Sequence, residues 1–251
     1  MHVERHPVPE ATGFRRVLSR TALRGLAALA DAMHVGVRAL QVAVRIGTGD
    51  ELTRPQLLQV FGVLGVSVLV VFVAGPGVAA AAIPAPDAVA DVAEGTGRLA
   101  MFVLYLALVA RSASGRRLFS YHGAEHKTIA AFERRGGMPA VDDARASSPV
   151  HPRCGTNFLT LCVLVAGVVY AFVPRSPVWT GAAWRVLLVP AVAVGAYELM
   201  RIAARSSGAV WARVVTMPGR TAQRLTTREP SPDQLEVAMA AIGELLRPDH
   251  T

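Results

Sequence analysis

Four runs of hydrophobic residues, separated by polar segments, set the pattern of this chain. The first covers Leu57–Ala74 without a charged residue and continues to Ile83 with only glycine and proline as interruptions, so it is long enough to cross a bilayer. The other three cover residues 99–110, 158–173 and 186–200, and each needs its flanks to reach the roughly 20 residues of a transmembrane helix. A soluble protein would bury these three as core helices, but four such runs leave few residues to form a core around them.

We therefore predict an all-α integral membrane protein with about four transmembrane helices. In residues 21–46, polar side chains recur every three or four positions, which predicts an amphipathic helix at the membrane interface or against the bundle. Ser231, followed by proline and then by Gln234, marks the start of an amphipathic C-terminal helix. The expected organisation is a disordered N-terminus over 1–20, one membrane domain over 21–250, spans near 57–80, 92–112, 157–174 and 184–204, a cytoplasmic His-rich loop over 113–156, and a cytoplasmic segment over 205–250.

Lysine and arginine are distributed unevenly around these spans. The chain holds 26 of them against 18 acidic residues, which gives a net charge of +8. They concentrate in residues 1–56, in 111–157 and beyond 200, whereas 75–97 contains none. This asymmetry predicts a multi-pass protein of the plasma (inner) membrane with both termini in the cytoplasm. Basic surface beside the membrane accounts for the charge, so specific nucleic-acid binding is not expected.

Two acidic residues stand inside or beside the hydrophobic runs. Glu94 precedes Arg98 by four residues, the spacing of a salt bridge near a helix start. Glu198 interrupts the last run and fits two interpretations. It is either a functional intramembrane carboxylate or one partner of an ion pair at the membrane interface.

The polar segment 121–158 carries the candidate chemistry. It contains three of the seven histidines and one of the two cysteines. His122, Glu125 and His126 form an H-x-x-E-H pattern, which on a helix places both imidazoles on one face and the carboxylate beside them. In that position Glu125 would polarise a metal-bound water. His151 and Cys154 follow and offer further nitrogen and sulfur ligands.

The same segment contains start and stop signals for a helix. Ser120 is a suitable N-cap for a helix from about Tyr121, and Gly136-Gly137 would end it after Arg135. The motif would then lie in the first two turns of this helix. Residues 141–150 are polar and are predicted to form a loop.

Zinc is the expected metal, because it accepts imidazole and thiolate in tetrahedral geometry. Three protein ligands would leave a position for water, as in catalytic sites, whereas four would close a structural site. Without metal, the residues would form a hydrogen-bonded cluster in which Arg153 pairs with Glu125 and the histidines bond backbone carbonyls. The candidate ligands are His122, His126 and one or both of His151 and Cys154.

Several long motifs resemble the bacterial YqhQ family, a group of membrane proteins described as predicted metal-dependent enzymes. They are FSYHGAEHKTIAAFE, HPRCGTNFL, RVLLVPAVAVGAYELMR and PGRTAQRLTTREPSPDQLEVAMAAI, in this order. The similarity covers Arg20 to Leu246. It implies a multi-span membrane protein whose TTREP stretch, Thr226–Pro230, folds back near the His-rich loop. The site residues implied are His122, Glu125, His126, His151, Arg153 and Cys154.

The chain departs from this family near its N-terminus. Family members usually begin with a glycine-rich segment that ends in a stretch like Glu-Gly-Val-Met-Met-Arg, and Ala11–Arg16 shows no such pattern. If that segment completes an active site, this chain would bind metal without catalysing a reaction.

Two functions therefore fit the sequence. The first is a membrane-embedded zinc hydrolase in which Glu125 accepts a proton from a zinc-activated water and Arg153 stabilises the oxyanion. The alternative is a non-catalytic membrane scaffold with a structural metal or a hydrogen-bonded histidine cluster. Besides the lipid bilayer, the partners of such a scaffold would be anionic lipid, another membrane protein, a translocation complex or a ribosome.

Overall fold

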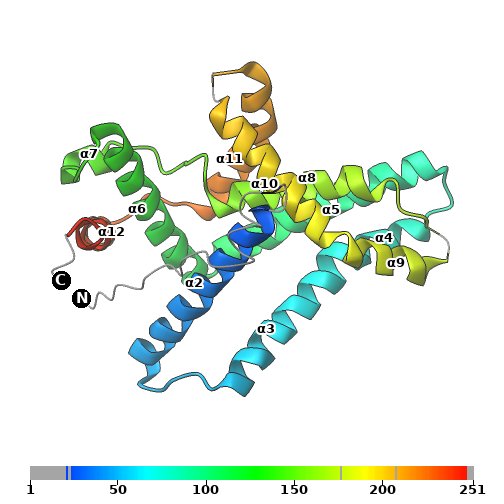
Figure 1. Cartoon of the computed structure of the whole chain (residues 1–251), viewed down its shortest axis with the longest axis horizontal. Coiled ribbons are helices and arrows are strands. Elements are labelled where there is room, and N and C mark those ends of the chain that lie inside the picture. The colour runs from blue at the N-terminus through cyan, green and yellow to red at the C-terminus, as the bar shows by residue number, and fades with distance from the viewer. Residues whose placement is uncertain (1–20, 22–23, 176, 207, 248–251) are drawn as a thin grey trace. The chain divides into compact units, whose positions relative to one another are not determined.

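Every regular element in the described residues is a helix, which confirms the all-α fold class (Figure 1). The computed structural model describes residues 21, 24–175, 177–206 and 208–247, so the disorder expected for residues 1–20 lies outside it. The helices are α2 (Arg24–Thr48), α3 (Arg54–Val68), the π-helix η1 (Leu69–Ala74), α4 (Gly75–Ala81), α5 (Asp87–Arg111), α6 (Ala113–Arg135), α7 (Val141–Arg145), α8 (Gly155–Tyr170), α9 (Val178–Leu187), α10 (Val189–Arg205), α11 (Val210–Thr226) and α12 (Pro232–Leu245).

The chain divides into two compact units. Within the described residues, unit 1 combines 103–161 with 199–247, and unit 2 combines 24–102 with 162–198. Helices α5, α8 and α10 contribute residues to both units. The single membrane domain over 21–250 stays a prediction.

Three helices are long and apolar enough to cross a membrane. Two of them, the continuous helix Arg54–Ala81 and α5, lie where the first two spans are predicted. The third is α2, whose 25 residues pass the same test of length and composition although its polar stripe predicts an interfacial helix. On Arg54–Ala81, the most apolar 18-residue window is wholly unburied, and Leu58 is 75% exposed. Such apolar side chains suit contact with lipid hydrocarbon.

The last two predicted spans are less regular than the hydrophobic pattern indicated. α8 is apolar but has only 16 residues, fewer than a complete span needs. The span predicted near 184–204 coincides with a bent helix pair, because α9 ends at Leu187 and α10 continues at an angle of 45°. Pro190 lies just after this break; it has no amide hydrogen and disfavours helical geometry in the preceding residue. If the bent pair counts as one span, the described residues contain four candidate spans by length and composition.

A buried group of charges joins three elements of unit 2. Glu94 and Arg98 form the predicted pair at 2.7 Å, and both side chains are only 3% exposed. Arg185 of α9 bonds the same carboxylate through two nitrogens, at 2.7 and 2.6 Å. The Arg98 Nε donates to the carbonyl of Phe72 in η1 at 2.9 Å. The pair is therefore the centre of an internal charge network rather than a helix-start salt bridge.

Glu198 forms an ion pair with Arg24, whose Nε donates to its Oε1 at 2.6 Å. This contact joins α10 to the start of α2 within unit 2. It supports the ion-pair interpretation of the acidic residue in the last hydrophobic run.

In unit 1, helix α6 packs against α7 and α12 (Figure 1). The shared core consists of Ala124, Ala131, Ala144, Leu235 and Met239. The start predicted for α12 is confirmed: Ser231 Oγ accepts from the Gln234 N–H, and Gln234 Oε1 accepts from the Ser231 N–H.

The predicted start of α6 near Tyr121 is wrong. The N-cap is Ser112, whose Oγ accepts from the Gly115 N–H at 2.9 Å. Ser120 lies inside the helix and donates to the Arg116 carbonyl. Ser112 offers the same capping chemistry as Ser120 two turns earlier. The H-x-x-E-H motif therefore lies in the middle of α6 rather than in its first turns.

Two further helices occupy segments that were not predicted to be helical. Residues 141–145 of the expected loop form α7, whose start is capped by Asp143 accepting from the Ala140 N–H. Residues 210–226 form α11, which continues through Pro218 and Gly219. These two residues ordinarily favour a helix break, so the local pattern did not predict α11.

We predict that Glu94→Gln destabilises the protein markedly. Removing the carboxylate leaves the guanidiniums of Arg98 and Arg185 buried without their counter-charge, which typically costs about 3–5 kcal/mol. For a chain of this size the apparent unfolding temperature in detergent should fall by about 10 °C. The matched control is Glu51→Gln, at a carboxylate that is 78% exposed. Equal shifts in the two variants would contradict the role of the network.

Candidate metal centre

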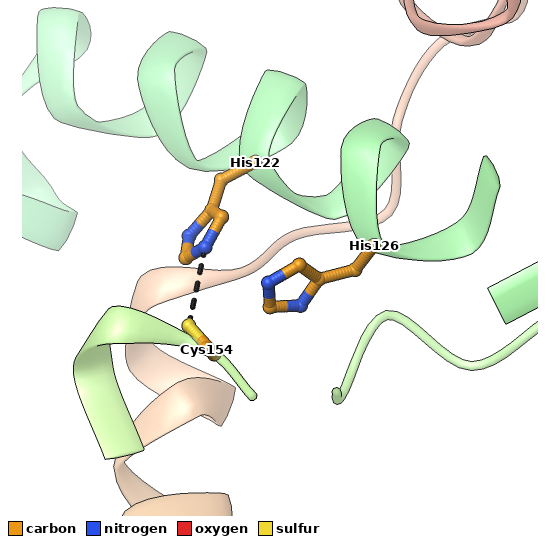
Figure 2. Close-up of side chains that lie close together, drawn as sticks. All are labelled: His122, His126 and Cys154. Atoms are coloured by element: carbon orange, nitrogen blue, oxygen red, sulfur yellow. Dashed lines mark hydrogen bonds between the residues drawn. The ribbon is translucent and has the colours of Figure 1, made fainter. Parts of the chain in front are cut away.

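Two imidazoles project from neighbouring turns of α6 toward the same region (Figure 2). His122 and His126 are four residues apart, so the helical repeat places them on one face. Their ring centres are 4.3 Å apart and the rings meet edge to face. His126 is buried and His122 is half-buried. The predicted juxtaposition of the two histidines is thus present.

A thiol completes the group. Cys154 immediately precedes α8, is 5% exposed, and its Sγ lies 3.4 Å from the Nε2 of His122 (Figure 2). The amide of Thr156, in the first turn of α8, also donates to this sulfur at 3.4 Å. One ligand atom from each of the three side chains lies within 4.8 Å of the others. A His-His-Cys group with this spacing can hold a metal ion.

Backbone carbonyls fix the orientation of both imidazoles. The Nδ1 of His122 lies 2.7 Å from the carbonyl oxygen of Thr226, and the Nδ1 of His126 lies 2.6 Å from that of Pro149. Because a carbonyl only accepts, each Nδ1 carries the hydrogen and each neutral ring keeps its lone pair on Nε2. Metal-binding histidines commonly have this second hydrogen bond, which sets the tautomer and the ring plane.

The segment before Cys154 is held by residues of α11 and α8. Gln223 is fully buried, and its side-chain amide bonds both the N–H and the carbonyl of His151, at 2.9 and 3.0 Å. The Asn157 side chain donates to the Pro152 carbonyl at 3.0 Å. Gly219 permits α11 to approach α8, since a Cβ there would lie 1.9 Å from the Asn157 side chain. The thiol is thus positioned by contacts between segments distant in sequence.

The TTREP stretch lies directly against α6, as the resemblance implied. The Arg228 N–H donates to the Phe119 carbonyl, and a Cβ on Gly123 would lie 2.0 Å from the Arg228 carbonyl oxygen. Lys127 and Glu229 form an ion pair between the same two segments. This close approach brings the carbonyl of Thr226 within reach of His122.

His151 and Arg153 bond a different residue, Glu133. His151 Nε2 and Arg153 Nη1 each lie 3.2 Å from an oxygen of this carboxylate. The Nδ1 of His151 accepts from the Arg153 N–H at 3.3 Å. Both ring nitrogens of His151 therefore have partners, and the residue stays outside the His-His-Cys group. The expected pairing of Arg153 with Glu125 is replaced by this contact with Glu133, which sequence reasoning missed.

Glu125 lies on a neighbouring face of α6. It is exposed and lines an apolar groove of about 560 Å³ between α6 and α12, together with residues such as Phe132 and Ile242. Its charge contributes to raising the pKa of His122. The carboxylate itself is not a member of the His-His-Cys group. The assignment of Glu125 and Arg153 as catalytic residues stays a prediction.

In the metal-free group, the contact between Cys154 and His122 shifts the pKa values of both side chains. Burial raises the pKa of the Cys154 thiol, but hydrogen bonds from the two imidazoles and from Thr156 outweigh burial and lower the pKa to about 5. The hydrogen bond to Cys154 raises the pKa of His122, against the opposing effect of burial. The thiolate is the form of cysteine that binds metal, so the lowered pKa of Cys154 favours metal binding.

The fold and the site together define a helical membrane-type protein with a buried His-His-Cys group. Over residues 21–248 the chain matches the family described as "Protein of unknown function (DUF1385)", and it belongs to this family. It is 33% identical over 151 residues to "Uncharacterized protein YqhQ" of Bacillus subtilis (strain 168). That match covers 60% of this chain and 47% of the relative, so the matched region spans about half the relative's length. No solved structure matches the chain.

We predict that the Cys154 thiol of the metal-free protein ionises as the pH rises through about 5, far below its ordinary pKa of 9.0. In a Cys162→Ser background Cys154 is the only thiol, and its thiolate absorbance in the ultraviolet reports the midpoint. His122→Ala should raise this midpoint, because a hydrogen bond to the thiolate is lost. His151→Ala should leave it unchanged. A midpoint near 9.0 before either histidine is replaced would contradict this electrostatic description.

Proposed function

We propose that this protein is a membrane-anchored metalloprotein in which His122, His126 and Cys154 bind one Zn²⁺, and that it hydrolyses a peptide or ester bond. The observation that carries this function is the convergence of three ligand atoms within 4.8 Å, with each imidazole fixed through its Nδ1. Three protein ligands leave a fourth tetrahedral position for water or substrate, the pattern of catalytic zinc sites.

Zinc fits the donor set better than the common alternatives. Two imidazole nitrogens and one thiolate are soft or borderline ligands, which disfavours magnesium and calcium. Zinc accepts such a mixture at tetrahedral geometry and does not change oxidation state. The burial of Cys154 and His126 would also limit access of bulk water to the metal.

The hydrolytic role assigns specific work to residues of the chain. When bound, zinc supplies a water whose pKa is lowered to about 7. Glu125 would accept the proton, and Arg153 would stabilise negative charge on the substrate carbonyl oxygen. Both residues must change position to do this, since Glu125 lines the groove beside α12 and Arg153 bonds Glu133. Substrate binding would supply the energy for these movements.

We place the protein in the plasma (inner) membrane with both termini in the cytoplasm. The support is the charge asymmetry of the sequence, because residues 75–97 between two spans carry no lysine or arginine while 111–157 carry eight. The metal centre belongs to this basic segment and to the segment after α10, so it would face the cytoplasm.

A second candidate is a non-catalytic scaffold whose metal fastens unit 1. Favouring it, the site residues and their carbonyl partners come from α6, from residues 149–154 and from the end of α11, which are distant in sequence. Glu125 is exposed rather than turned toward the thiol and imidazoles. The partner of the scaffold would be anionic lipid, another membrane protein, a translocation complex or a ribosome.

We predict about one zinc per chain in detergent-purified protein, measured by elemental mass spectrometry. His122→Ala, His126→Ala and Cys154→Ala should each lose most of the metal, because each removes one of three ligands. His151→Ala is the matched control and should retain it, since both nitrogens of that ring have other partners. Metal loss in the control would make His151 a ligand. Absence of metal from well-folded protein after zinc addition would exclude the proposed function.

Glu125→Gln should separate the hydrolase from the scaffold. In a hydrolase this variant keeps its zinc but loses about 10²-fold or more in kcat on peptide or ester substrates, because the proton acceptor is gone. Glu236→Gln, an equal change of charge at an exposed position of α12, is the control. Equal rates in the two variants would reject the catalytic role of Glu125 and favour the scaffold.

A further inference from the structure

Unit 1 contains a polar pocket that is distinct from the metal centre and independent of the function proposed for that centre. This basic pocket has a volume of about 530 Å³ and lies between the first turns of α6, the segment after α11 and the start of α12. Its lining residues are Arg116, Arg117, Ser120, Arg228, Glu229 and Gln234.

The basic pocket carries a strong excess of positive charge. Three guanidiniums face a single carboxylate, Glu229, which is already paired with the buried Lys127 at 2.5 Å. Within the described part of the chain, no hydrogen bond or ion pair is formed by the Arg117 side chain. The Gln234 oxygen accepts from the Ser231 N–H, which leaves its amide hydrogens for a ligand. A ligand of this pocket should therefore be an anion that accepts several hydrogen bonds.

The position of the pocket identifies the source of such an anion. α5 is a candidate membrane span that ends at Arg111, and α6 begins two residues later. The last two carbonyls of α5 accept hydrogen bonds from the pocket: that of Arg111 from Arg116 and that of Ala110 from Arg228, the latter at 3.1 Å. A span that ends at Arg111 would place the pocket at the depth of lipid headgroups.

An apolar side chain beside the guanidiniums fits the same depth. Leu118 follows Arg117 directly and is 61% exposed. At a bilayer surface, arginine interacts with headgroup phosphates while neighbouring leucine enters the acyl region. The positive charge of the pocket and the exposure of Leu118 therefore both fit a position at the membrane interface.

We propose that the basic pocket binds the phosphate group of an anionic phospholipid. Guanidinium is the side chain best matched to phosphate, because its N–H groups form paired hydrogen bonds with two phosphate oxygens. Basic pockets beside membrane spans bind anionic headgroups by this chemistry. The bilayer around the spans supplies the ligand at high local concentration, so no soluble source is required.

Binding of a water-soluble short-chain phosphatidylglycerol to the full chain in detergent tests this assignment, with isothermal titration calorimetry as the readout. Wild-type protein should bind it saturably and should bind short-chain phosphatidylcholine far more weakly. Arg117→Gln, which breaks no described hydrogen bond, should weaken binding about fivefold. Combined replacement of Arg116, Arg117 and Arg228 by glutamine should weaken it about a hundredfold.

The matched control replaces Arg213, Arg220 and Arg224 of α11 by glutamine, which removes the same charge outside the pocket. It should change affinity by less than about twofold, well below the effect of the pocket arginines. If the control weakens lipid binding as much as the pocket variant does, the assignment of the binding site to this pocket is overturned. Equal binding of phosphatidylcholine would overturn recognition of the anionic headgroup. If inorganic phosphate binds as tightly as the lipid, the conclusion that the ligand is a phospholipid is overturned.

Two accompanying measurements separate loss of the pocket from loss of the fold. Circular dichroism and zinc content are recorded for every variant, since no pocket arginine side chain contacts the His-His-Cys group among the described contacts. Retained zinc with lost lipid binding supports the pocket, whereas retained lipid binding in the triple pocket variant rejects it. Because the two sites are measured separately, failure of the zinc proposal would leave the result on lipid unchanged. If the triple variant does not fold, Arg117→Gln alone decides.

Discussion

The candidate site depends on the hydrogen bonds that tie two imidazoles to backbone carbonyls. The helical repeat alone places His122 and His126 on one face of α6, but it does not choose which ring nitrogen faces the thiol. The carbonyls of Thr226 and Pro149 make that choice. Each accepts a hydrogen bond from the Nδ1 of one ring, so the Nε2 of that ring is left to contact the thiol or bind a metal. These carbonyls come from two other segments, so the site exists only when unit 1 is folded.

The framework behind these carbonyls is unusually polar. Gln223 and Asn157 are fully buried and bond the backbone before Cys154, and glycines at 123 and 219 allow the segments to approach closely. Burying such groups is costly unless they are hydrogen-bonded. Here their hydrogen bonds to the backbone before Cys154 hold the thiol in one position. In unit 2, Glu94 serves a comparable purpose by holding two arginines in an apolar environment.

Local sequence patterns correctly predicted the features that depend on residues close in the sequence. They failed for features that depend on contacts between distant segments. The spacing of His122 and His126 and the cap at Ser231 followed directly from helical geometry. The separation of His151 from the His-His-Cys group did not, because it depends on contacts of His151 with Glu133 of α6 and Gln223 of α11. The helix start at Ser112 uses a local cap of the same chemistry as the one expected at Ser120, and α11 continues through Pro218, a residue that ordinarily favours a helix break. Thr226 entered the site only through the resemblance to a family.

X-ray absorption at the zinc edge is the sharpest test of the His-His-Cys site, because it reports the ligands of the metal without a substrate. For zinc-loaded protein in detergent, we expect one sulfur at about 2.3 Å from the metal and nitrogen or oxygen neighbours at about 2.0–2.1 Å. The sulfur contribution should disappear in Cys154→Ser and persist in Cys162→Ser. A wild-type spectrum without sulfur, or one unchanged by Cys154→Ser, would contradict the His-His-Cys site.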